Sequence, residues 1–104
     1  MGEWNTMAPM SVARGALGVG VLGGLLYAVG GGDENVNSLA SVEAYTGVGA
    51  DAWKSVASMS EKRFNPGIGV LGGLLYAVGG QDENGYSLAS VEAYNPAKNA
   101  WTTK

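Results

Sequence analysis

The sequence predicts an all-β fold made of two copies of one structural unit, and three observations lead to this prediction. First, the chain repeats itself after 49 residues, so that Val21–Gly31 recurs unchanged as Val70–Gly80. Second, 18 of the 104 residues are glycine, which tight turns favour and helices disfavour. Third, Leu25–Val29 is apolar at every position, as expected for a strand that is covered on both faces.

The expected strands follow one another within a repeat. Gly18–Val21 is the inner strand, Leu22–Gly24 supplies a tight turn, and Leu25–Val29 returns as the second strand of a hairpin. After a polar loop, Ser41–Tyr45 alternates between apolar and polar residues as a third strand should, and Trp53–Ala57 supplies a fourth, outer strand. The second repeat has the same order.

A series of distinctive residues appears in the same order in both repeats. It consists of a Gly-Gly doublet that ends a strand, then a Val-Glu-x-Tyr segment, then a Trp, followed in the first copy by a Met and an Arg. The residues are Gly30-Gly31, Glu43, Tyr45, Trp53, Met59 and Arg63, and then Gly79-Gly80, Glu92, Tyr94 and Trp101. With this pattern the chain resembles two consecutive kelch repeats, over essentially its whole length.

The resemblance implies a fold and a domain division, and the chain departs from the family pattern at two places. Residues 1–52 form the first repeat, with an outer strand at residues 4–10, and residues 53–104 form the second, with a shortened final outer strand. Pro66 and the segment 46–49 depart from the pattern, which affects loop shape and leaves the fold unchanged. The glycines at the start of each inner strand are expected where strands converge and bulky side chains would collide.

The fold class is therefore two four-stranded kelch blades per chain that assemble into a closed β-propeller. Two blades leave two apolar outer faces, larger than a soluble monomer tolerates. Propellers have roughly four to eight blades, and six is the usual kelch number, so we expect a homotrimer. Three segments compete for the outer position, beginning at Trp4, Trp53 and Trp101. We expect Trp4–Met10 to complete the second blade of a neighbouring chain, so that the ring closes by strand exchange.

Composition excludes several function classes. The net charge of -3, with only 6 basic residues, gives no footprint for nucleic acid. The chain contains neither cysteine nor histidine, so we expect no catalytic residue, no cofactor, no metal and a cytoplasmic location. The uncharged run from residue 15 to residue 32 is too rich in glycine for a membrane helix, and no membrane partner is expected.

Several motifs have a structural alternative that we favour. Gly18–Gly23 fits the dinucleotide pattern G-x-G-x-x-G, but a strand follows it where a helix is required. Glu43 and Glu92 could act as an acid and base pair, although one per blade is better explained as a hydrogen-bond partner of the backbone or of the repeated arginine. The acidic loops after each Gly-Gly doublet could ligate calcium, but a solvated loop face is the better explanation.

The candidate binding residues lie in two kinds of loop, which the kelch resemblance places on one face around a central pocket. Arg14 and Arg63 lie in the loops that lead into the inner strands. They would bind an acidic peptide or protein, or they would instead hold the strand and the glutamate of their own blade in place, and both alternatives stay open. The candidates are Arg14, Arg63, Asn65, Asp33, Glu34, Asp82, Glu83 and Tyr86.

The predicted function is that of a non-catalytic module for protein or peptide interaction that self-assembles by head-to-tail blade packing, similar to the propellers of BTB-kelch substrate adaptors. One alternative is a designed or fragment scaffold that only folds and assembles. Another is a kelch-type enzyme domain, which would need the histidine and cysteine ligands of a copper site that this sequence lacks.

Overall fold

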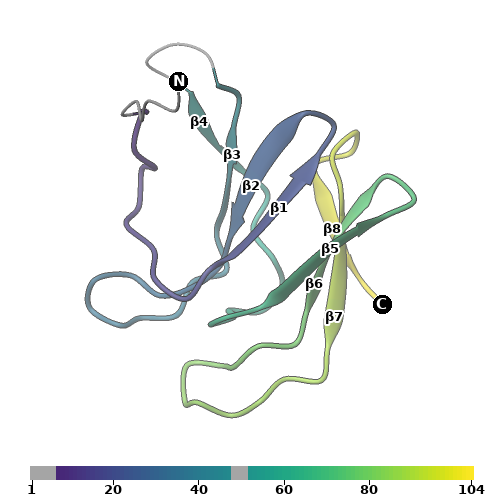
Figure 1. The fold of residues 1–104 in the computed structure, drawn as a ribbon. Helices are drawn as coiled ribbons and strands as arrows, with labels where there is room; N and C mark the ends of the chain where they lie inside the picture. Colours follow the sequence, from purple (N-terminus) through teal and green to yellow (C-terminus); the bar gives the residue numbers. More distant parts are fainter. Residues whose placement is uncertain (1–6, 48–51) are drawn as a thin grey trace, which may run out of the picture.

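The computed structural model describes residues 7–47 and 52–104, and its regular elements are all β-strands. They form two four-stranded antiparallel sheets with the strand orders β1-β2-β3-β4 and β5-β6-β7-β8 (Figure 1). The predicted all-β fold with two four-stranded sheets is confirmed. The described part of the chain contains no helix with the length and apolarity needed to cross a bilayer. The strands are β1 Gly18–Leu22, β2 Leu25–Val29, β3 Val42–Tyr45, β4 Trp53–Val56, β5 Gly67–Leu71, β6 Leu74–Val78, β7 Val91–Asn95 and β8 Ala100–Thr103.

The inner hairpin of each sheet closes through two glycines. Gly23 and Gly24 have φ angles of 59° and 79°, and the register places Leu22 opposite Leu25. Two successive residues with positive φ make the kind of two-residue turn that matches the twist of paired strands and that favours glycine at both positions. The second hairpin repeats this geometry at Gly72 and Gly73.

An aromatic pair joins the third and fourth strands of each sheet. Tyr45 lies opposite Trp53 with ring centroids 5.0 Å apart, and Tyr94 lies opposite Trp101 at 5.2 Å. The indole N–H of Trp101 donates to the carbonyl oxygen of Ala57 at 2.8 Å, which ties the outer strand to the connection between the sheets.

The prediction of strand exchange is wrong for the second blade. β8 pairs with β7 in the same chain, and it has the same length as β4, so the final outer strand is not shortened. The N–H of Lys104 extends this pairing with a hydrogen bond to the carbonyl oxygen of Val91 at 2.8 Å. Of the segment expected to take this place, residues 7–10 are not in a strand, and Trp4 lies outside the described residues.

The two sheets pack against each other with β1 facing β5 and β6 (Figure 1). Ile68 of β5 lies over Gly18 and Gly20 of β1, as expected for glycines where inner strands converge. A Cβ atom on Gly20 would lie only 2.6 Å from Ile68 Cγ2, so no side chain fits there. The core is continuous across both sheets and includes Tyr27, Val29, Val42, Met59, Leu75, Ala77 and Tyr94.

Candidate binding surface

A buried ion pair anchors the second blade. The Arg63 guanidinium donates to Glu92 at 3.0 Å, to the Ser90 hydroxyl at 3.0 Å and to the Gly79 carbonyl oxygen at 2.8 Å. Glu92 also accepts a hydrogen bond from the backbone N–H of Ser60 at 2.8 Å. The side chains of Arg63 and Glu92 are almost wholly buried, and each charge is neutralised by the other and by hydrogen bonds.

The first blade contains the same arrangement. The Arg14 guanidinium donates to Glu43 at 3.2 Å, to the Ser41 hydroxyl at 2.9 Å and to the Gly30 carbonyl oxygen at 3.0 Å. Burial raises the pKa of the Glu43 carboxyl, but the hydrogen bonds from Ser11 and Arg14 and the charge of Arg14 lower it more. The pKa of Glu43 therefore lies below its ordinary value.

These contacts correct the interpretation of the two arginines as ligands for an acidic peptide. Both guanidinium groups are fully buried, because the long side chain reaches back from the loop into its own blade, where a glutamate needs a positive partner. Of the two alternatives left open for Arg14 and Arg63, the structure therefore supports the one in which they hold the blade together. The complementary prediction, that Glu43 and Glu92 bind backbone groups and the repeated arginine, is confirmed.

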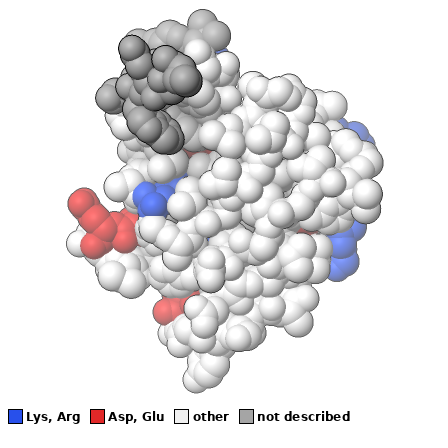
Figure 2. Space-filling model, viewed as in Figure 1, with Lys and Arg blue, Asp and Glu red and all other residues white. Residues whose placement is uncertain are grey.

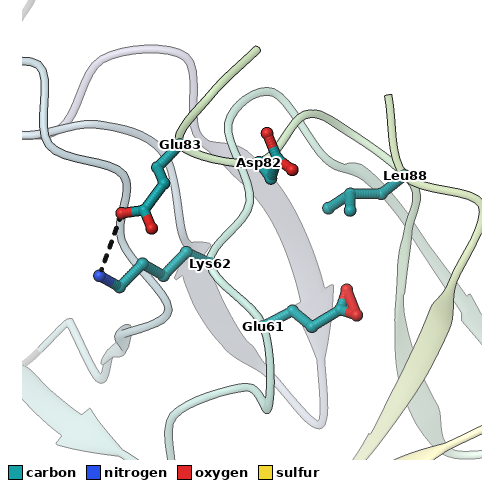
Figure 3. Close-up of a pocket in the computed structure, with 5 residues that line it drawn as sticks. All are labelled: Glu61, Lys62, Asp82, Glu83 and Leu88. Atoms are coloured by element: carbon teal, nitrogen blue, oxygen red, sulfur yellow. Dashed lines mark hydrogen bonds and ion pairs between the residues drawn. The ribbon is translucent and has the colours of Figure 1, made fainter. Parts of the chain in front are cut away.

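Two shallow hollows lie where the predicted loops meet, and they occupy equivalent positions in the two repeats. Each has a volume of about 250 Å³. In the second repeat, Figure 3 shows the Glu83 carboxylate reaching toward the Lys62 ammonium group, while Glu61 and Leu88 border the other side. The first hollow is lined by Ser11, Val12, Ala13, Asp33, Glu34 and Asn35, and the second by Glu61, Lys62, Asp82, Glu83 and Leu88.

The two loop aspartates have a structural task inside their loops. One carboxylate oxygen of Asp33 accepts hydrogen bonds from the backbone N–H groups of Asn35 and Asn37, each at 2.9 Å. Asp82 holds its loop in the same way, through Asn84 and Tyr86. The hydrogen bond from the Asn37 backbone is the main reason why the pKa of Asp33 lies below its ordinary value. The aspartates thus shape the loops, as side chains of this type commonly do in turns.

The remaining predicted residues are separated by the structure. Glu34 and Glu83 project into solvent beside the hollows, and Tyr86 is 70% exposed at the tip of its loop. Asn65 does not line either hollow; it has a φ of 52°, and its N–H bonds to the Ala16 carbonyl oxygen at the junction of the two blades.

Sequence reasoning missed Glu61 and Lys62, although a signal for them exists. They stand where the first repeat has Val12 and Ala13, so a comparison of the two repeats position by position would have marked them. The Lys62–Glu83 ion pair is long, at 3.5 Å, and both side chains are more than half exposed, so it contributes little to stability. Among the residues that the structure describes, no group of three or more acidic side chains is arranged to hold a metal ion.

Comparison with known families gives one match. The family model described as "Kelch motif" matches residues 13–60 and again residues 62–103, which together cover most of the chain. No curated protein matches the chain. Kelch repeat domains are typically non-catalytic interaction modules. With two matched motifs, two four-stranded antiparallel sheets and a repeated Arg–Glu pair, this chain belongs to the kelch-repeat family.

Proposed function

We propose that the chain is a non-catalytic interaction module whose two blades become part of a closed propeller when identical chains associate head to tail. Three copies would give the six blades that we expect for a kelch ring. The loops that border the two hollows then lie on one face of the ring, where several copies of a weak contact can add.

The observation that carries this proposal is the exposure of the second blade. Val29 is 0% exposed because the second blade covers it, whereas its equivalent in that blade, Val78, is 47% exposed. Figure 2 shows a surface made mainly of uncharged residues, with acidic and basic side chains gathered toward its edges. A propeller blade is an apolar sheet that is normally covered by another blade on each side.

Native mass spectrometry and light scattering test the association. We expect a species of three chain masses at micromolar concentration. A well-folded monomer under these conditions would contradict the proposal, and a dimer or tetramer of chains would keep the ring but change its blade number.

We propose further that the loop face binds a basic segment of a partner protein rather than an acidic one. The arginines are buried, and among the described side chains that line the hollows Lys62 is the one basic residue, whereas the acidic residues are Asp33, Glu34, Glu61, Asp82 and Glu83. Such a surface attracts positive charge and repels acidic peptides.

Fluorescence anisotropy with labelled oligo-arginine and oligo-glutamate peptides of equal length tests this choice. We expect only the basic peptide to bind, more weakly in high salt, and the double variant Glu34→Gln with Glu83→Gln to bind it several-fold more weakly. Lys98→Gln, at the opposite end of the sheets, is the matched control and should bind as the unchanged protein does. Binding of neither peptide would favour the alternative of a scaffold that only folds and assembles.

A further inference from the structure

We infer that the contact between copies repeats the contact between the two blades of one chain, with Val19 of one copy seated over Gly67 and Gly69 of the next. The inference rests on the proposed head-to-tail association and adds the residues that make it. We call the exposed side of the second blade the glycine face (Gly67, Gly69, Tyr76, Gly80, Leu88) and the exposed side of the first blade the valine face (Met10, Val19, Leu26, Tyr45).

The contact inside one chain shows what such a junction requires. Ile68 lies over Gly18 and Gly20, and Cβ atoms placed on these glycines would collide with it. A Cβ on Gly20 would also lie 2.8 Å from Leu75 Cδ1, and Leu75 is fully buried. The two glycines therefore form a socket in β1 that the branched side chain of β5 fills.

The second blade carries the same socket, and no side chain among the described residues fills it. Gly67 and Gly69 stand 49 residues after Gly18 and Gly20, and a Cβ on Gly69 would meet no atom within 4 Å. The residue equivalent to Ile68 is Val19, a β-branched side chain that is 53% exposed on the opposite side of the molecule. One chain thus has an open socket at Gly67 and Gly69 on one side, and on the other side it has the exposed branched side chain of Val19, which would fit such a socket.

Backbone groups beside the socket repeat as well. Within the chain, Gly31 N–H donates to the Arg63 carbonyl oxygen at 2.8 Å, and Arg63 N–H donates to the Leu39 carbonyl oxygen at 3.1 Å. Between copies the equivalent donors and acceptors are Gly80 and Leu88 on the glycine face and the backbone of Arg14 on the valine side. Directional bonds of this kind would fix the register of one blade on the next.

A tyrosine pair at the junction inside the chain also has equivalents on the two free faces. Tyr27 and Tyr94 meet edge to face across the junction inside the chain, with centroids 5.6 Å apart, and both are buried. Their equivalents, Tyr76 and Tyr45, lie one on each free face and are only half-buried. Contact between copies would bring these two rings together and add an aromatic pair of the kind already present.

The strongest support comes from the positions where the repeats differ. Inside the chain the Phe64 ring fills the space above Gly32, so closely that a Cβ on Gly32 would collide with it. Between copies the large residue changes sides: Gln81 replaces Gly32 and Gly15 replaces Phe64. Two differences that would each cause a clash or a void alone are complementary together, as expected if the free faces meet each other.

Two variants block the two faces separately. Val19→Asp places a charge on the valine face, and Gly69→Trp fills the socket of the glycine face. Both sites are exposed and Gly69 has open space around it, so the chain itself can accept each change. We expect each variant alone to be a monomer and an equimolar mixture to form a one-to-one heterodimer, because each variant keeps the face that the other has lost.

Gly20→Trp is the matched control, since it is the same substitution in a socket that Ile68 already fills. We expect it to disturb the packing between blades and to lower the melting temperature, while Gly69→Trp keeps the far-UV circular dichroism of a β-protein. If a single variant is unstable alone, mixing should restore both its fold and its association, so the mixture remains informative.

The outcomes separate the inference from the proposed function. A monomeric unchanged protein would overturn both. If the unchanged protein associates and both variants associate equally well, the ring stands and the named contact is wrong. If both variants are monomers and their mixture forms no heterodimer, the loss of association is unspecific and the inference also fails.

Discussion

The Arg63–Glu92 pair joins three separate segments of the second blade. The guanidinium binds the end of β6 and the segment before β7, while the carboxylate binds the backbone that leads into β5. Because both charges are buried, the loss of one leaves the other buried without its charged partner.

Arg63→Ala should therefore lower the free energy of unfolding by about 3–5 kcal/mol, the usual cost of leaving a buried charge unpaired. Urea denaturation measures this change. Lys62→Ala, the adjacent residue with an exposed ion pair, is the control and should change stability by less than about 1 kcal/mol. Equal small effects for both variants would mean that Arg63 does not hold the blade.

Glu43 makes the stability of the folded protein depend on pH. Its folded-state pKa lies below the ordinary value of 4.5, so the stability it contributes is present above about pH 4.5 and is lost as the pH falls through the folded-state pKa. Glu43→Gln should be less stable than the unchanged protein at neutral pH but should lose less stability between neutral and acidic pH. Denaturation curves at a series of pH values measure both differences; an unchanged slope would contradict the role of Glu43.

At this scale the sequence predicted which residues recur, but it did not predict which way the arginines point. Arg14 and Arg63 stand in loops that lead into inner strands, and loop residues usually face solvent. Their side chains are long enough to reach the glutamate of the same blade, and the balance between solvent and that partner depends on three-dimensional distances. The recurrence of Arg and Glu together in both repeats was the available signal.

Among the strands, β8 was the hardest to predict from the sequence, and it forms the outer edge of the second sheet. It has only four residues, yet it pairs along β7, and Trp101 adds a ring contact with Tyr94 and a hydrogen bond to the Ala57 carbonyl oxygen. The hairpins were predictable because glycine doublets and apolar runs are local signals. The choice between Trp4 and Trp101 was not, because two similar segments compete for one edge and only the pairing in three dimensions decides between them.

Removal of residues 100–104 should therefore expose the edge of β7 and destabilise the second blade, because the chain loses a full strand of backbone hydrogen bonds and a packed indole. Removal of residues 1–6 is the matched truncation and should leave both described sheets intact. Hydrogen exchange at the amides of β7 distinguishes the two: protection should fall only in the C-terminal truncation. Loss of protection after the N-terminal truncation would instead support the hypothesis of strand exchange between chains.

On the scale of the whole molecule, the two blades share one core, but equivalent positions in the two blades are covered to different extents. Equivalent residues such as Val29 and Val78 differ in exposure because the second blade covers Val29, whereas no described part of the chain covers Val78 to the same extent. The repeat predicted this incompleteness from the sequence, since two copies of a propeller unit cannot close a ring. The size of the ring depends on the angle between successive blades, which no local pattern encodes.

The place of β8 in its own chain also determines how such a ring would behave over time. Because every described strand of a blade comes from one chain, no strand would have to leave its sheet when two copies separate. Dissociation would break only the contacts between blade faces, and its rate would not be limited by unfolding. When ordinary and isotope-labelled protein are mixed, native mass spectrometry should show mixed rings forming faster than the core amides of β2 and β6 exchange by global unfolding. Equal rates for the two processes would mean that a shared strand holds the copies together.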